Sequence, residues 1–201
     1  MLQYELPTSV TIEGVEHPIR RQGDFRMVLD CFRLLQDEEL DDNERILACL
    51  VVFYEELDGI ESVYLLGNIE EAVKQMFSFF NCNQESIGVK AEGKVIDWDK
   101  DALMIISAIN KVAGKEVRAE KYLHWWTFTA YYMAIGDCAL ATIVNIRRKL
   151  MLNKKLEKFE QEYVKENPEL FNRRDNYTKG EREFIDEIRA NWSNNGGIID
   201  G

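Results

Sequence analysis

Three carboxylates stand at alternate positions in one short segment, the closest approach in this sequence to a metal-binding motif. Asp97, Asp99 and Asp101 offer oxygen ligands at the spacing with which a calcium loop begins. The rest of that motif is missing, because Ala102 stands where glycine is required and Ala108 where a bidentate glutamate is required. Acidic residues before a helix are stabilised by the helix dipole without any metal. We therefore expect this cluster to begin a helix and not to bind calcium.

The histidines and cysteines show no spacing typical of a metal or catalytic site. His17 and His124 are far apart, and neither has a second histidine at metal-ligand spacing. A Cys–His nucleophilic pair through Cys31 or Cys138 is formally possible, but no neighbouring residue supports it. The absence of C-x-x-C spacing favours reduced, mostly buried thiols. The four cysteines are Cys31, Cys49, Cys82 and Cys138. Without a phosphate-binding glycine loop or a nucleophile elbow either, we expect no enzyme activity, no metal, no cofactor and no disulfide.

The segment YLHWWTFTAYYMAI, at residues 122–135, is the most unusual in the chain. As a helix it is apolar on nearly every side, which is typical of a central core helix or of one shared between the core and a partner. It is too short and too polar to span a membrane. Within it, His124 is expected to be a hydrogen-bonded histidine of the core or its rim and not a proton carrier.

The two sides of this helix can be assigned by their spacing. Trp125, Phe128 and Tyr132 share one side, whereas Trp126 and Met133 lie on another. Tryptophan and tyrosine join apolar area to a polar group, which makes them common interface anchors. We predict that the side with Trp125 contacts a partner and that the side with Trp126 packs in the core.

A basic run follows, RRKLMLNKKLEK at residues 147–158, with a net charge of +5. It is either a site for an acidic partner or a solvated helical face that balances an acidic body. Together with the aromatic segment and an amphipathic stripe beyond it, this run completes the set of candidate partner-binding residues. They are Tyr122, His124, Trp125, Phe128, Tyr132, Arg147, Arg148, Lys154, Lys155, Phe159 and Tyr163.

The elements that must position these segments are mostly helical. Alternation around the Glu13–Gly14 turn predicts a small N-terminal β-hairpin, with a third strand at residues 2–6 left open. Beyond it the hydrophobic period is that of helices, which predicts a mainly α, multi-helix bundle with two C-terminal amphipathic helices. The expected helices span about residues 24–35, 41–57, 68–80, 99–113, 119–135, 138–152, 154–166 and 178–192. We expect a body at residues 1–150 and a helical extension with a frayed end at residues 151–201.

Composition and charge limit the kinds of partner that the chain is expected to bind. The chain has 201 residues and a net charge of −11, with residues 1–146 at −12 and residues 147–201 at +1. An acidic chain is a poor ligand for nucleic-acid phosphates. No apolar run is long enough to cross a bilayer, and the N-terminal residues lack the pattern of a signal peptide. We expect a soluble cytoplasmic protein that binds neither nucleic acid nor membrane.

Five short motifs give the sequence a family resemblance. Over roughly residues 5–170 it resembles the small tail proteins encoded just upstream of the tape-measure gene in long-tailed, non-contractile phages and prophages of Gram-positive bacteria. The most specific part is the Leu-His-Trp-Trp-x-Phe core. The motifs are DWDKD at 97–101, YLHWWxF at 122–128, GD at 136–137, IRRK at 146–149 and KKLEK at 154–158.

The resemblance implies a non-catalytic tail assembly chaperone. Such proteins coat the tape-measure protein and keep it soluble until tail-tube subunits replace them. The implied partners are the tape-measure protein and a second tail assembly chaperone, and association of the chain with further copies of itself stays open. The implied location is the host bacterial cytoplasm and not the mature virion. Two other functions stay open: a regulatory adaptor that binds a host protein, and a minor structural tail protein.

Overall fold

The computed structural model describes residues 5–37, 39–84, 95–98 and 100–171 of the chain. Of these residues 61% lie in helices, and a small two-stranded antiparallel sheet stands at the N-terminal end. The predicted mainly α class is therefore confirmed. The predicted helix at residues 178–192 lies outside the described residues, as does most of the open third strand.

The N-terminal hairpin pairs β1 (Ser9–Ile12) with β2 (Val15–Pro18), in the register that sets Ile12 opposite Val15. Both turn residues have positive φ, 49° at Glu13 and 82° at Gly14, as a two-residue hairpin turn that follows the strand twist requires. Ile12 is buried, and the backbone N–H of Glu13 donates to Glu71 across 3.0 Å. The hairpin thus covers one side of α3 (Ile69–Phe80).

Several predicted helix starts are confirmed by their caps. Asp41 and Glu44 form a reciprocal capping box, and Asn68 accepts the N–H of Glu71 at 3.0 Å. The 3₁₀ turn η2 was not predicted, because it carries no amphipathic period. Besides α3, the elements are η1 (Arg20–Gly23), α1 (Phe25–Leu34), α2 (Asp42–Phe53), η2 (Ile60–Leu66), α4 (Ala102–Ala113), η3 (Val117–Ala119), α5 (Trp125–Met133), α6 (Ala139–Met151), α7 (Lys158–Glu166) and α8 (Pro168–Phe171).

The largest departure from the predicted elements is the start of α5, which was expected near residue 119 and lies at Trp125. Between η3 and α5 the backbone groups are engaged by a distant helix. The N–H of Leu123 donates to Asp24, and its carbonyl accepts from Phe25. These bonds replace helical ones, so tertiary contacts override the local preference for a helix.

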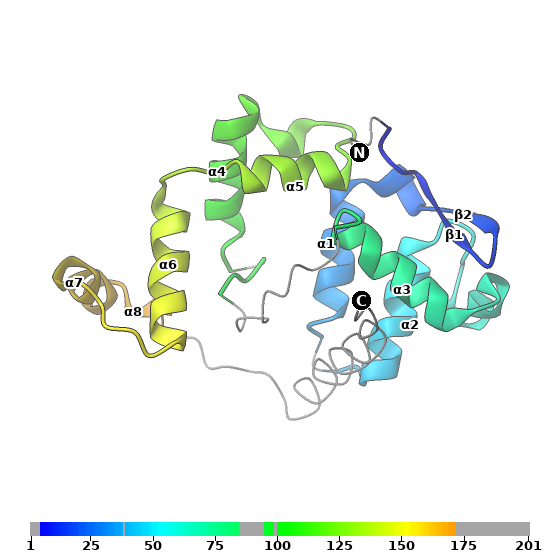
Figure 1. The fold of residues 1–201 in the computed structure, drawn as a ribbon, viewed down its shortest axis with the longest axis horizontal. Helices are drawn as coiled ribbons and strands as arrows, with labels where there is room; N and C mark the ends of the chain where they lie inside the picture. Colours follow the sequence, from blue (N-terminus) through cyan, green and yellow to red (C-terminus); the bar gives the residue numbers. More distant parts are fainter. Residues whose placement is uncertain (1–4, 38, 85–94, 99, 172–201) are drawn as a thin grey trace, which may run out of the picture.

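The elements are spread along the long axis of the molecule (Figure 1). The hairpin, α2 and α3 lie at one end, α4 and α5 in the middle, and α6 with α7 at the other end. Aromatic rings fill much of the core, and the rings of Phe25 and Phe128 stack with centroids 4.5 Å apart. Among the described helices, none combines the length and the apolarity that crossing a membrane requires.

A buried ion pair fixes α6 against the start of α4. Two nitrogens of the Arg147 guanidinium lie 2.7 and 3.1 Å from the two oxygens of Asp101. Their side chains are 7% and 2% exposed, respectively. Arg147 also donates to the carbonyls of Val95 and Leu170. The pair therefore joins α4, α6 and α8.

Removing one partner of this pair should destabilise the fold. In Arg147→Met the Asp101 carboxylate stays buried without its cation, and we expect a loss of about 3–5 kcal/mol in the free energy of unfolding. Urea denaturation followed by circular dichroism measures it. The control is Lys155→Met, at an exposed position, where we expect a change within about 0.5 kcal/mol. Equal stability of the two variants would contradict the structural role of the pair.

Candidate partner-binding surface

One buried carboxylate organises the region around α5. Asp24, only 4% exposed, caps α1 by accepting the N–H of Arg26 at 3.0 Å. Its second oxygen accepts the N–H of Leu123, also at 3.0 Å. Phe25 completes the link by donating its N–H to the Leu123 carbonyl at 2.9 Å. Two segments 99 residues apart are thereby locked together through backbone groups.

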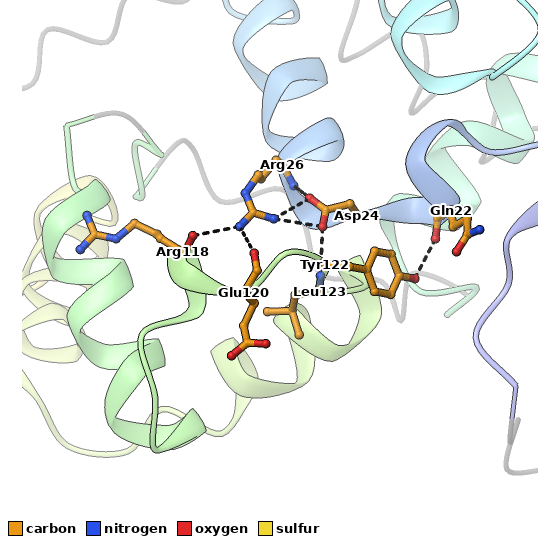
Figure 2. Close-up of polar contacts among 7 residues, drawn as sticks. All are labelled: Gln22, Asp24, Arg26, Arg118, Glu120, Tyr122 and Leu123. Atoms are coloured by element: carbon orange, nitrogen blue, oxygen red, sulfur yellow. Dashed lines mark hydrogen bonds and ion pairs between the residues drawn. The ribbon is translucent and has the colours of Figure 1, made fainter.

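The Arg26 guanidinium extends this link to the loop before α5 (Figure 2). One nitrogen lies 3.1 Å from both oxygens of Asp24, and the other donates to the carbonyls of Arg118 and Glu120. The hydroxyl of Tyr122 donates to the Gln22 carbonyl at 3.0 Å on the other side. This cluster of hydrogen bonds fixes the rotation of α5 about its axis, because both ends of the entering loop are held.

His124 is the N-cap of α5. Its Nδ1 accepts the N–H of Trp126 at 3.1 Å, so its proton sits on Nε2, which donates to the Pro7 carbonyl at 3.0 Å. The ring packs so closely on η1 that a Cβ at Gly23 would lie 3.0 Å from Nε2 and 2.7 Å from Phe79. The expectation of a hydrogen-bonded core histidine agrees with these contacts.

The electrostatic setting of His124 favours the neutral ring. Burial lowers its pKa below the ordinary value of 6.5 and outweighs two opposing influences. These are the hydrogen bond to the Pro7 carbonyl and the negative charge of Asp24, which both favour the protonated form. Protonation would place a hydrogen on Nδ1 and remove the helix cap.

The two adjacent tryptophans both anchor α5 to the end of α3. The indole N–H of Trp125 donates to the Phe80 carbonyl, and that of Trp126 to the Phe79 carbonyl, each at 2.9 Å. Both bonds reach carbonyls in the last turn of α3, where helical donors are missing, although the Phe79 carbonyl also accepts the N–H of Cys82. The rings differ in depth: Trp125 is 4% exposed, whereas Trp126 is only partly buried.

The predicted orientation of α5 is wrong for Trp125, Phe128 and Met133, although Trp126, expected in the core, is half-buried against Phe79. Trp125 and Phe128 are buried, and Tyr132 is half-buried beside Trp98, so this side packs in the core. Met133, expected in the core, is 65% exposed. The physical reason is the set of hydrogen bonds around Asp24, Arg26, Tyr122 and Leu123, which we call the Asp24 cluster. It sets the rotation of a helix whose own sequence is apolar on both sides.

The outward side of α5 is consequently an apolar stripe. We call it the α5 stripe, and it consists of Tyr122, Trp126, Ala130 and Met133. Tyr122 is 44% exposed and Ala130 is exposed, so the stripe runs from the entering loop to the last residue of the helix. Trp126, Ala130 and Met133 have the spacing of one helical face, Tyr122 precedes them in the loop, and the stripe carries no charged side chain. A surface of this kind fits the apolar face of another helix.

The other predicted contact residues are divided between core and surface. Arg147 is buried in its ion pair with Asp101 and cannot reach a partner from there. Tyr163 is half-buried and faces Phe171 at a ring distance of 6.0 Å. The exposed members of the set are Arg148, Lys154, Lys155 and Phe159. They belong to α6, to α7 and to the connection between these helices, at the opposite end of the molecule from the hairpin (Figure 1).

The carboxylates and thiols considered above have structural neighbours. Asp101 holds Arg147 and accepts the N–H of Asp97, whose own side chain accepts the N–H of Lys100. The Cys138 sulfur accepts the N–H of Ala141 at the start of α6. In the described part of the chain no group of three or more His, Cys, Asp or Glu side chains could hold a metal ion.

Sequence reasoning missed a second exposed apolar region, which spans η2 and the start of α3. Its large side chains are 44–73% exposed and belong to Ile60, Tyr64, Leu65 and Ile69. The available signal is the run of apolar residues around Glu61 at residues 60–66, but this run has no helical period and therefore predicts no element.

Comparison with known proteins identifies the family. The model of the family described as Bacteriophage Gp15 protein matches residues 2–172. The chain belongs to this family, which makes it a bacteriophage protein and confirms that part of the predicted resemblance. Comparisons with curated proteins and with solved structures gave no match.

The two sides of α5 should respond differently to truncation. Trp125→Ala removes a buried ring and its hydrogen bond, and we expect a loss of about 3–5 kcal/mol in the free energy of unfolding. Met133→Ala removes an exposed side chain and should change it by less than about 1 kcal/mol. Urea denaturation measures both values. A larger loss for Met133→Ala would show that the orientation of α5 is not the one described.

The free energy of unfolding should decrease as the pH is lowered, and His124 should cause part of this decrease. Its pKa is lowered in the folded state, so the unfolded state takes up the proton first as pH drops through about 6.5. Unfolding is therefore favoured at the lower pH. In a His17→Asn background, which leaves His124 as the one histidine, the free energy of unfolding should decrease from pH 7.5 to 5.5. Adding His124→Asn should flatten that decrease, and an unchanged slope would refute the assignment.

Proposed function

We propose that this bacteriophage protein is a non-catalytic tail assembly chaperone that binds the tape-measure protein and keeps it soluble. Family membership supports a role in the phage life cycle, and the motif resemblance supports the step of tail assembly. The observation that carries the proposal is the α5 stripe. It is an apolar helical face turned outward on a helix that tertiary hydrogen bonds hold in place.

The chemistry of the stripe suits a long helical partner. Trp126 and Tyr122 have their polar atoms engaged with Phe79 and Gln22, so they present mainly ring surface. Ala130 between them and Met133 leaves room for a ridge of side chains from a second helix. Each contact of this size is weak, and many copies bound along one tape-measure chain would supply avidity.

The proposed function also specifies where the protein acts and which proteins it works with. The chaperone acts in the host cytoplasm before the tail tube forms and leaves before the virion is complete. It works beside a second tail assembly chaperone. A regulatory adaptor or a structural tail protein would also be a phage protein, and the two differ from a chaperone in what they bind and where they remain.

Co-expression with the tape-measure protein of the same phage tests the proposal. The wild-type chain should keep the tape measure soluble and co-purify with it. Met133→Glu, which adds a charge at the most exposed large side chain of the stripe, should lower the co-purified amount about tenfold because the charge must be desolvated on binding.

The matched control is Val112→Glu. Val112 is also an exposed apolar residue in the last turn of a helix, but it lies on α4. It should leave capture unchanged, and circular dichroism should show both variants folded. If the wild type neither binds nor solubilises the tape measure, the chaperone function is refuted. If Met133→Glu captures as well as the wild type, the α5 stripe is not the contact.

A further inference from the structure

One end of the molecule is acidic and apolar at the same time. Residues 55–71 hold six acidic and no basic side chains. They include Glu61 on η2 and Glu70 on α3, which are exposed among the apolar region of η2 described above. Hydrogen bonds from Asn68 and to Glu71 attach the hairpin tip at Glu13 to this region, so the surface has a defined shape. We call it the acidic end.

The opposite end is basic and apolar. Lys154, Lys155 and Lys158 are exposed around the connection from α6 to α7. Beside them Leu152 is 41% and Phe159 61% exposed. We call this surface the basic end. The segment 147–158 contains a single acidic residue.

An ion pair holds the basic end in shape. The Lys149 ammonium lies 2.7 and 2.9 Å from the two oxygens of Glu160, a contact that ties α7 to α6. Lys149 keeps the pKa of Glu160 below its usual range, with help from the backbone N–H of Glu157. The connection from α6 to α7 therefore presents Lys154, Lys155 and Lys158 on a fixed pair of helices, whereas the exposed Glu162, Glu166 and Glu169 lie further along α7 and α8.

The two ends face away from each other along the long axis of the molecule. The hairpin and α3 lie at one extreme of the view and α7 at the other (Figure 1). A single molecule therefore cannot bring its own two ends together. The two ends carry opposite charges, and both expose large apolar side chains. Complementary charge and buried apolar area are both typical of specific protein–protein contacts.

We propose that the acidic end of one copy binds the basic end of the next, in a head-to-tail contact. Such a contact joins two different surfaces, so each added copy presents a new free end. Chains of copies grow until strain or a partner stops them. The charges steer the encounter and set the register, while the apolar side chains supply the affinity. This goes beyond the proposed function, since it needs no tape-measure protein.

Sedimentation of the full chain alone tests the contact. At about 50 mM salt the average mass should rise steadily above 23.5 kDa with concentration, without stopping at a dimer. At about 500 mM salt it should return toward the monomer, because salt screens exposed charges. A constant 23.5 kDa at every concentration would overturn the proposal in favour of another occupant of these ends, and so would a dimer of fixed mass.

Charge reversal makes the test specific. Glu61→Lys/Glu70→Lys reverses two exposed charges of the acidic end, and Lys154→Glu/Lys155→Glu reverses two of the three exposed lysines of the basic end. Each variant alone should associate at least tenfold more weakly than the wild type, because like charges then face each other. A 1:1 mixture should restore association, since acidic and basic ends can again alternate.

The control for net charge is Lys111→Glu/Lys121→Glu, which changes two exposed lysines away from both ends. It should associate like the wild type within about twofold. Circular dichroism verifies the fold of every variant. Failure of the mixture to recover association would overturn the head-to-tail contact, whatever the two variants do separately.

Discussion

The fold around α5 depends on the carboxylate of Asp24, which is buried and must be fully satisfied there. A buried charge is stable only with opposite charge and hydrogen-bond donors around it. Asp24 finds them in Arg26 and in the N–H groups of Arg26 and Leu123. One of these donors comes from a loop 99 residues away. The same carboxylate therefore caps α1 and holds the loop that leads into α5. Arg26 extends the constraint by binding the carbonyls before α5.

This constraint gives the apolar helix α5 its two roles. A helix that is apolar all round has no preferred side of its own, so its neighbours decide which side is buried. The Asp24 cluster turns Trp125 and Phe128 inward, where they pack with Phe25 and Phe32. The same rotation leaves the α5 stripe outside, as an apolar surface on a rigid support. Preorganisation of this kind lowers the entropy lost on binding, which suits the many weak contacts of the proposed function.

Exposed charged residues, like the exposed apolar ones, gather in particular regions of the molecule. Acidic residues gather beside η2 and basic ones beside the α6–α7 connection, at opposite ends of the long axis. The buried carboxylates of Asp101 and Glu160 each have a basic partner, Arg147 and Lys149 respectively. The exposed charges at the two ends are the ones on which the proposed head-to-tail contact depends.

By itself the sequence determined the mainly α class, the hairpin and the capped starts of α2 and α3, because caps, turns and hydrophobic period are local properties. It also contained the motifs that place the chain among bacteriophage proteins. Only the tertiary structure decided where α5 begins, which of its sides is buried, and that Arg147 lies in the core. Those outcomes depend on Asp24 and Asp101 reaching partners far along the chain. No local pattern encodes them, because a buried charge selects its partner by position in the fold and not by distance in the sequence.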